Sequence, residues 1–141
     1  MRRLIPVLGV ALVVSALAAA PAAALKLRTF QSPSGNIGCA IVVSNAGSDA
    51  RCDVAQHSWK ASPKPSSCHL DWGNGLVVGT HGRAQFVCAG DTVLHQGPTL
   101  AYGNSIRLGK FSCASRSSGI RCVNRATGHG FNASRTVARR F

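Results

Sequence analysis

Apolar and polar residues alternate in short stretches along most of the chain that follows residue 25. Every second residue of the segment 37–43 is apolar, which is the period of a half-buried β-strand. A turn-forming segment, 44–49, comes next, and residues 51–54 lead back. The pattern therefore predicts a β-hairpin that closes near Asn45 and Ala46.

Similar short runs recur down the chain, separated by turns that are rich in Gly and Ser. They predict further strands at 76–78, 84–88, 92–94, 100–102, 106–108, 111–113 and 120–122. Residues 56–68 contain Pro63 and Pro65 and are expected to form a loop. No window sustains a helical period, so we expect a small all-β domain built from antiparallel hairpins.

The first 24 residues have the order of a secretory signal peptide. A basic start at Arg2 and Arg3 is followed by an uncharged apolar stretch and an Ala-rich end, and cleavage after Ala24 fits best. The alternative is an uncleaved membrane anchor, but the second half of the stretch is mostly Ala, which inserts weakly. We expect residues 1–24 to be removed. Residues 25–141 then form a single domain that is secreted or associated with the cell envelope and has no membrane span.

The chain contains six cysteines, and in a short exported protein these are typical of a disulfide framework. The first hairpin places Cys39 opposite Cys52, and a second hairpin around residues 116–119 places Cys113 opposite Cys122. Cys68 and Cys88 are paired by elimination. Loop entropy gives about 3 kcal/mol for each bridge, which is large beside the net stability of a small domain. No Cys-x-x-Cys motif occurs, which argues against a thioredoxin-like enzyme.

A weak internal similarity links two of the cysteine segments. Gly-Asn-Ile-Gly-Cys at 35–39 resembles Ser-Gly-Ile-Arg-Cys at 118–122. We attribute this to the apolar neighbour that a bridged strand needs on the same face, rather than to a duplication.

Three longer segments together resemble a known family. They are Phe-Gln-Ser-Pro-Ser-Gly-Asn-Ile-Gly-Cys at 30–39, Phe-Val-Cys-Ala-Gly-Asp-Thr-Val at 86–93, and Gly-Ile-Arg-Cys-Val-Asn at 119–124 followed by Gly-His-Gly-Phe at 128–131 and Ser134-Arg135. The chain is similar to an uncharacterised family of small exported actinobacterial six-cysteine proteins, a domain of unknown function. The resemblance implies export and the six-cysteine domain, and it supplies no catalytic residue.

Positive charge is concentrated in the second half of the domain. The formal net charge is +12, all four acidic residues are Asp, and residues 92–141 hold eight basic residues and no acid. The second hairpin predicts that Lys110 lies opposite Arg125, with Arg121 on the same face. We hypothesise an anion-binding group of Lys110, Arg121, Arg125, Arg135 and His129. The alternative is a basic face that only aids solubility.

The expected partner of this group is an anionic polymer of the cell envelope or another polyanion. Sequence-specific nucleic-acid binding is not expected, because aromatic residues make up 6% of the chain and most of them should be core. The oligomeric state is left open.

His129 is the most distinctive polar residue, because it stands between Gly128 and Gly130. We favour a structural role in which its ring bonds a backbone carbonyl and anchors the C-terminal segment. The alternative is a small secreted hydrolase or nuclease that uses His129 as acid or base. A third hypothesis is a disulfide-rigid protease inhibitor or toxin that presents the loop 59–67. No catalytic residue, metal ligand or cofactor is assigned, so a non-enzymatic binding domain is favoured.

Overall fold

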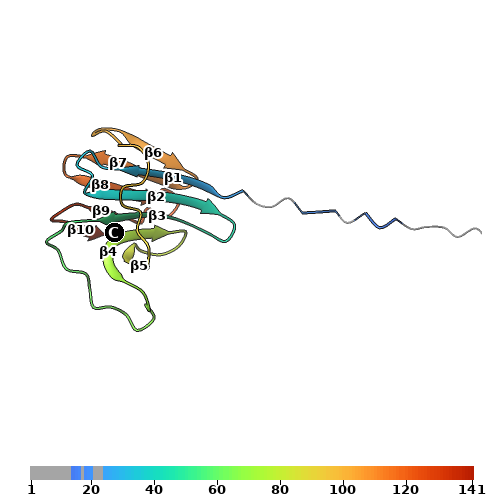
Figure 1. Cartoon of the computed structure of the whole chain (residues 1–141), viewed down its shortest axis with the longest axis horizontal. Coiled ribbons are helices and arrows are strands. Elements are labelled where there is room, and N and C mark those ends of the chain that lie inside the picture. The colour runs from blue at the N-terminus through green and yellow to red at the C-terminus, as the bar shows by residue number, and fades with distance from the viewer. Residues whose placement is uncertain (1–13, 17, 21–23) are drawn as a thin grey trace, which may run out of the picture.

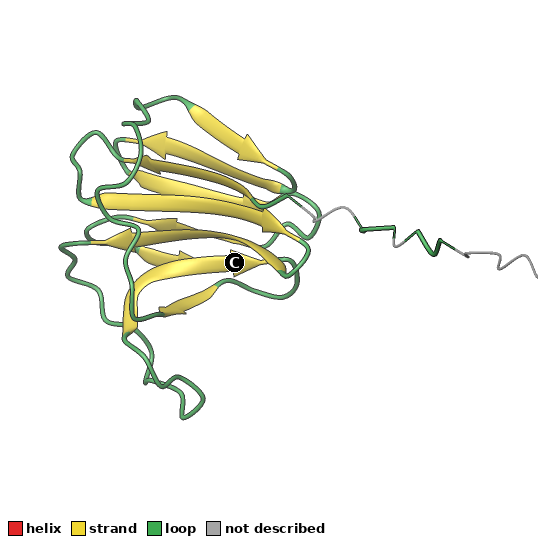
Figure 2. Cartoon of the chain, turned by 45° about the vertical axis from the view of Figure 1, so that its right-hand side comes forward, coloured by secondary structure: helices red, strands yellow, loops and turns green. Residues whose placement is uncertain are grey.

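The computed structural model describes residues 14–16, 18–20 and 24–141 of the chain. The predicted signal peptide, residues 1–24, lies mostly outside the described residues. The described part is all-β and contains no helix, which confirms the predicted fold class, and Figure 2 shows it as strands and loops alone. Accordingly, no described segment forms a helix of the length and apolarity that a membrane crossing requires.

Ten strands are present in the described residues. In chain order they are β1 (Lys26–Gln31), β2 (Ile37–Ser44), β3 (Gly47–Val54), β4 (Trp72–Gly79), β5 (Gln85–Cys88), β6 (Ser105–Leu108), β7 (Phe111–Arg116), β8 (Gly119–Asn124), β9 (Gly130–Ala133) and β10 (Ala138–Arg140).

The strands form two five-stranded antiparallel sheets, each built from one continuous half of the domain. Sheet A has the order β1-β2-β3-β4-β5, and sheet B has the order β10-β9-β8-β7-β6. The sheets face each other, with β3 in contact with β7 and β8, and β4 in contact with β8 and β9 (Figure 1). The strands turn apolar side chains toward the opposite sheet, and these are buried on the central strands and partly buried on β6 and β10, so the core lies between the sheets.

Two disulfides occupy the centre of this core. Cys39 faces Cys52 across β2 and β3, and Cys113 faces Cys122 across β7 and β8, as the hairpins predict. All four residues are fully buried, and Sγ of Cys52 lies 3.7 Å from Sγ of Cys122 in the opposite sheet. The two bridges therefore stack on each other and form the contact between the sheets at this point.

The two sheets repeat one arrangement around these bridges. In each, the second and third strands carry the disulfide, and a glycine stands on the fourth strand beside the third. A Cβ atom at Gly75 would collide with the carbonyl oxygen of Cys52, and a Cβ atom at Gly130 would collide with that of Cys122. The similar sequence segments 35–39 and 118–122 end on the first cysteine of one bridge and on the second of the other, so they do not occupy matching positions.

The third disulfide, Cys68–Cys88, lies at the periphery and confirms the pairing reached by elimination. It ties the long connection 55–71 to the end of β5. As expected, this connection contains no regular strand, and its green trace projects from the lower edge of the sandwich in Figure 1. The indole N–H groups of Trp59 and Trp72 donate to the carbonyls of Ser134 and Ser62, both at 2.8 Å, and hold its two ends.

Residues 89–98 form a strap over the outer face of sheet A, and the strand predicted at 92–94 is wrong. The carboxylate of Asp53, which is 2% exposed, accepts hydrogen bonds from Thr92 Oγ1 and Val93 N, both at 3.0 Å. The backbone here bonds a side chain instead of a neighbouring strand. Gly38 allows the approach, because a Cβ atom there would collide with the carbonyl of Val93.

The strand predicted at 100–102 is also wrong. The chain meets sheet A only through an isolated bridge between Thr99 and Gln31, and it then turns away toward sheet B. Gln31 N donates to the carbonyl of Pro98 at 3.0 Å, and Leu100 N donates to that of Gln31 at 2.9 Å. These bonds use the free edge of β1, so the segment extends sheet A by one bridge only.

Candidate anion-binding face and end cleft

The outer face of sheet B presents arginines among small residues. Strand register places Ser105, Ala114, Arg121, Asn132 and Arg139 in one row across the sheet, because residues paired across strands share a face.

The adjacent row contains Arg107, Ser112, Val123 and Gly130. Arg107, Arg121 and Arg139 are exposed and are called here the basic face. They stand on β6, β8 and β10, so neighbouring arginines are about 10 Å apart across the strands. Arg140 turns inward instead and lies 4.7 Å from the ring centre of Phe86.

No Asp side chain neutralises the basic face in the described part of the chain. The salt bridges of the described residues both involve Arg51 in sheet A, and all four Asp of the chain precede residue 92. The Arg121 guanidinium lies 4.2 Å from the ring centre of Phe141 and 3.4 Å from Asn132 Oδ1. Within the described part, the side chains of Arg107 and Arg139 make no hydrogen bond or salt bridge. Their charge is left to interact with solvent or with a bound anion.

Three of the five predicted residues gather at one end of sheet B. Arg125 N donates to the carbonyl of Lys110 at 2.8 Å, so these residues lie opposite each other, and Arg125 Nη2 donates to the carbonyl of Gly109 at 2.8 Å. His129 lies in the adjacent turn, where its carbonyl accepts from Asn124 N at 2.8 Å.

The ring of His129 faces the C-terminal segment. Its Nδ1 atom lies 3.3 Å from the carbonyl oxygen of Phe141, which can only accept, so Nδ1 donates. This contact agrees with the anchoring role expected for His129. No group of three His, Cys, Asp or Glu that could hold a metal occurs among the residues described.

Arg135 lies apart from that group, in the turn between β9 and β10 at the opposite end of the sheet. Its guanidinium donates to Gln56 Oε1 at 2.9 Å, and its carbonyl accepts from Ser58 N at 2.8 Å. The predicted residues therefore do not form one cluster. Arg107 and Arg139, which do share the face of Arg121, were not among the candidates. The strand predicted at 106–108 contains Arg107 between two apolar residues, which indicates an outward-facing side chain. No strand was predicted around Arg139.

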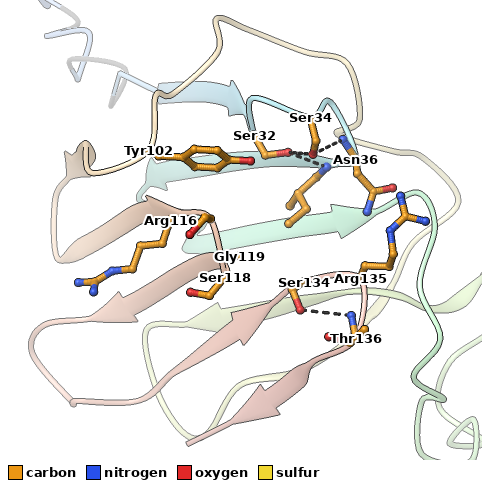
Figure 3. A pocket seen from close by; sticks show the side chains of 12 residues that line it. Ser32, Ser34, Asn36, Tyr102, Arg116, Ser118, Gly119, Ser134, Arg135 and Thr136 are labelled. Carbon is orange, nitrogen blue, oxygen red and sulfur yellow. Dashed lines mark hydrogen bonds between the residues drawn. The ribbon is translucent and has the colours of Figure 1, made fainter.

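At the end of the sandwich near Arg135, turns from both sheets enclose a cleft of about 320 Å³, here called the end cleft (Figure 3). The turn between β1 and β2 forms one wall, and the β7–β8 and β9–β10 turns form the other. The lining residues are Ser32, Ser34, Asn36, Ile37, Tyr102, Arg116, Ser117, Ser118, Gly119, Ser134, Arg135 and Thr136.

The end cleft is polar and carries positive charge only. Figure 3 shows Arg116 and Arg135 extending toward opposite ends of it, with the ring of Tyr102 on the side of Arg116 and its hydroxyl toward Ser32. The wall from sheet A is fixed by its own hydrogen bonds, since Ser32 Oγ accepts from Ile37 N at 3.1 Å and contacts Ser34 Oγ at 3.1 Å. Tyr102 is 51% exposed, and its hydroxyl makes no hydrogen bond within the described residues.

A groove of about 480 Å³ on the outer face of sheet B adjoins the end cleft. It is lined by Arg116, Ser118, Gly119, Ile120, Arg121, Asn132 and Val137, and it shares the first three with the end cleft. The tip of the β7–β8 hairpin therefore separates two hollows that open on either side of it. Together they lead from Tyr102, over this tip, to Arg121 on the basic face.

The projecting loop is the element that the inhibitor hypothesis requires. Residues 62–67 are exposed, whereas Trp59 packs against Phe86 with ring centres 5.8 Å apart, so the exposed stretch is shorter than the predicted 59–67. That hypothesis stays a prediction.

Comparison with known proteins identifies the family of the chain and nothing finer. Neither the curated proteins nor the solved structures contain a match to it. A family model described as a family of unknown function (DUF6636) matches residues 8–141. Because this match spans nearly the whole sequence, the chain belongs to that family of unknown function.

Proposed function

We propose that this protein is an exported, non-enzymatic β-sandwich domain that binds an anionic polymer of the cell envelope through its basic face. Residues 1–24 act as a cleaved signal peptide, and residues 25–141 form the working domain. Three disulfides in so small a domain fit an oxidising compartment outside the cytoplasm. The resemblance to small exported actinobacterial proteins agrees with export, and the family match, which begins at residue 8, includes most of the proposed signal peptide.

The observation that carries the proposal is the unpaired charge of sheet B. Residues 92–141 hold eight basic residues and no acid, and three of the arginines stand on one sheet face, on alternate strands. A polyanion that lies along such a face releases its bound counterions, which is the main driving force for binding of this kind. A rigid, disulfide-supported sheet suits an extended polymer because it holds the arginines in place before binding.

The hydrolase alternative has less support in the geometry. His129 Nδ1 bonds the backbone oxygen of Phe141, and no hydrogen bond joins His129 to an Asp side chain in the described part of the chain. The contact is that of an anchor for the C-terminal segment.

The test replaces Arg107, Arg121 and Arg139 together with Gln and measures binding of inorganic polyphosphate over a range of salt concentrations. Each lost contact lowers the slope of log affinity against log salt by about 0.7–0.9, so we expect a slope reduced by about 2–3 and weaker binding at every salt concentration. The matched control replaces Lys26, Lys60 and Lys64 with Gln, which removes the same charge outside sheet B. Equal effects of the two triple variants would reject the basic face as the binding site.

A further inference from the structure

We infer that the polymer is an acidic polysaccharide, and that the end cleft holds one of its sugar units while the basic face contacts its charged groups. This inference rests on the proposed function and names the class of polymer.

The lining of the end cleft matches a ligand that carries hydroxyl groups. Seven of its twelve lining residues bear a hydroxyl, and a hydroxyl both donates and accepts hydrogen bonds. Phosphate chains offer acceptors only and are complemented by donors alone, such as Lys and Arg. The hydroxyls of a sugar offer both kinds of group. A cleft dominated by Ser, Thr and Tyr is therefore better suited to a sugar than to a bare phosphate chain.

Tyr102 supplies an apolar surface in the lining of the cleft, on the side of Arg116. Its exposed ring can cover the C–H face of a sugar ring while its hydroxyl stays available for hydrogen bonding. The two tryptophans are already engaged, because both pack near Phe86 and both indole N–H groups bond carbonyls. Proteins that bind single-stranded nucleic acid stack successive bases on several aromatic residues. One exposed ring among the described residues favours a sugar over a row of bases.

The position of the charges fits a sugar polymer with acidic groups at intervals. Arg116 and Arg135 lie at opposite ends of the end cleft, and the groove leads from Arg116 to Arg121. Arginine binds carboxylate, sulfate and phosphate groups through paired N–H donors, so each of these substituents fits. A polymer that leaves the cleft over the β7–β8 tip would next meet the arginines of the basic face.

The experiment compares three polyanions of matched chain charge, polygalacturonate, inorganic polyphosphate and oligothymidylate, with the wild-type domain and with Tyr102→Ala. We expect Tyr102→Ala to weaken polygalacturonate binding about tenfold, the effect of losing one aromatic contact, and to leave polyphosphate binding within about twofold. Tyr102→Phe should retain most of the affinity. Leu70→Ala is the matched control, because Leu70 is 53% exposed and lies outside the end cleft.

The possible results separate this inference from the proposed function. If Tyr102→Ala changes binding of polygalacturonate and polyphosphate equally, or changes neither, the sugar site is rejected while the triple arginine variant still decides the basic face. Tighter, Tyr102-dependent binding of oligothymidylate than of polygalacturonate would also reject it, in favour of a nucleic acid. If the wild-type domain binds none of the three at low salt, the proposed function itself fails.

Discussion

Asp49 is a partly buried carboxylate on the outer face of sheet A. It lies on β3 directly opposite Val42, in a groove that also contains Leu27 and Val77. Burial in these surroundings raises the pKa of the Asp49 carboxyl, and the positive charge of Arg51 offsets only part of the effect. The folded protein therefore carries a cost for keeping this carboxylate ionised at neutral pH.

We predict that Asp49→Asn increases the free energy of unfolding at neutral pH. The raised pKa means that the folded state takes up the proton before the unfolded state does, so wild-type stability rises as the pH falls through the folded value. The advantage of the Asn variant should shrink over the same range and vanish below the ordinary value of 3.8. Urea unfolding at several pH values, followed by Trp fluorescence, measures this. A gain that persists unchanged in acid would contradict the assignment.

The pKa of the Asp91 carboxyl is shifted in the opposite direction, because Asp91 forms a salt bridge with Arg51 that Asp49 does not form. A hydrogen bond and the charge of Arg51 lower the pKa of this carboxyl. The stability that Asp91 contributes is therefore present above its ordinary pKa and is lost as the pH falls through the folded value.

At the scale of elements, the strap 89–98 depends on one buried carboxylate. Asp53 accepts from Thr92, from Val93 and twice from Arg51, whose side chain is only 15% exposed. Asp91 binds the same arginine from a position that is 79% exposed. The two aspartates therefore allow a comparison between a buried and an exposed partner of one guanidinium.

We predict that Asp53→Ala costs about 3–5 kcal/mol of unfolding free energy, because it removes the buried partner of a largely buried guanidinium and also leaves Thr92 Oγ1 and Val93 N without their acceptor. Asp91→Ala should cost less than about 1 kcal/mol, as exposed pairs do. Urea titrations give both values, and thermolysin digestion reports on the strap, which offers cleavage before Val93 and Leu94. Similar costs for the two variants, or an uncut strap in Asp53→Ala, would show that Asp53 does not hold this element.

The same scale shows what local sequence pattern could and could not predict. The hairpins at Cys39 and Cys113 were predictable because alternation, turn residues and cysteines agreed within about fifteen residues of chain. The apolar residues of the strap give the same local pattern as a short strand, so the sequence predicts a strand there. Its actual conformation is set by hydrogen bonds to Asp53, about forty positions earlier in the chain. Strands β9 and β10 are not predicted, because both are short and because β10 contains Arg139 and Arg140, which resemble a charged tail.

At the scale of the whole molecule, each of the two stacked disulfides should contribute more to the free energy of unfolding than the peripheral one. Chain entropy alone predicts that the peripheral disulfide contributes more, because it closes a longer loop. Cys68 and Cys88 are 20 residues apart, whereas Cys113 and Cys122 are 9 apart. Removal of the central pair also empties fully buried volume at the contact between the sheets, whereas Cys88 is exposed.

We therefore predict that Cys113→Ala with Cys122→Ala destabilises the domain more than Cys68→Ala with Cys88→Ala, by about 1–3 kcal/mol. Thermal and urea unfolding of the two double variants under oxidising conditions provide the comparison. The reverse order would mean that loop closure, rather than core packing, governs what these bridges contribute.

The candidate site was predictable in its charge but not in its shape. Counting residues was enough to locate the excess of arginine in the second half of the chain. The end cleft was not predictable, because its walls come from turns about 80 to 100 positions apart, such as Ser34 and Ser118, that meet only when the sheets pack. Arg135 is close to Arg125 in sequence, which suggests that the two lie together. Strand β9 runs between them, so Arg135 lies at the opposite end of sheet B.

All three disulfides join residues within the same sheet or its own connecting loop, and the structure has no free cysteine among its described residues. Each half of the domain can thus complete its oxidation before it meets the other, using only partners from its own stretch of chain. An exported polypeptide that emerges from its N-terminus would close the bridges of sheet A while the arginine-rich half is still being delivered. The order in which the thiols arrive then limits disulfide mispairing between the two halves. No disulfide joins the two sheets across their interface.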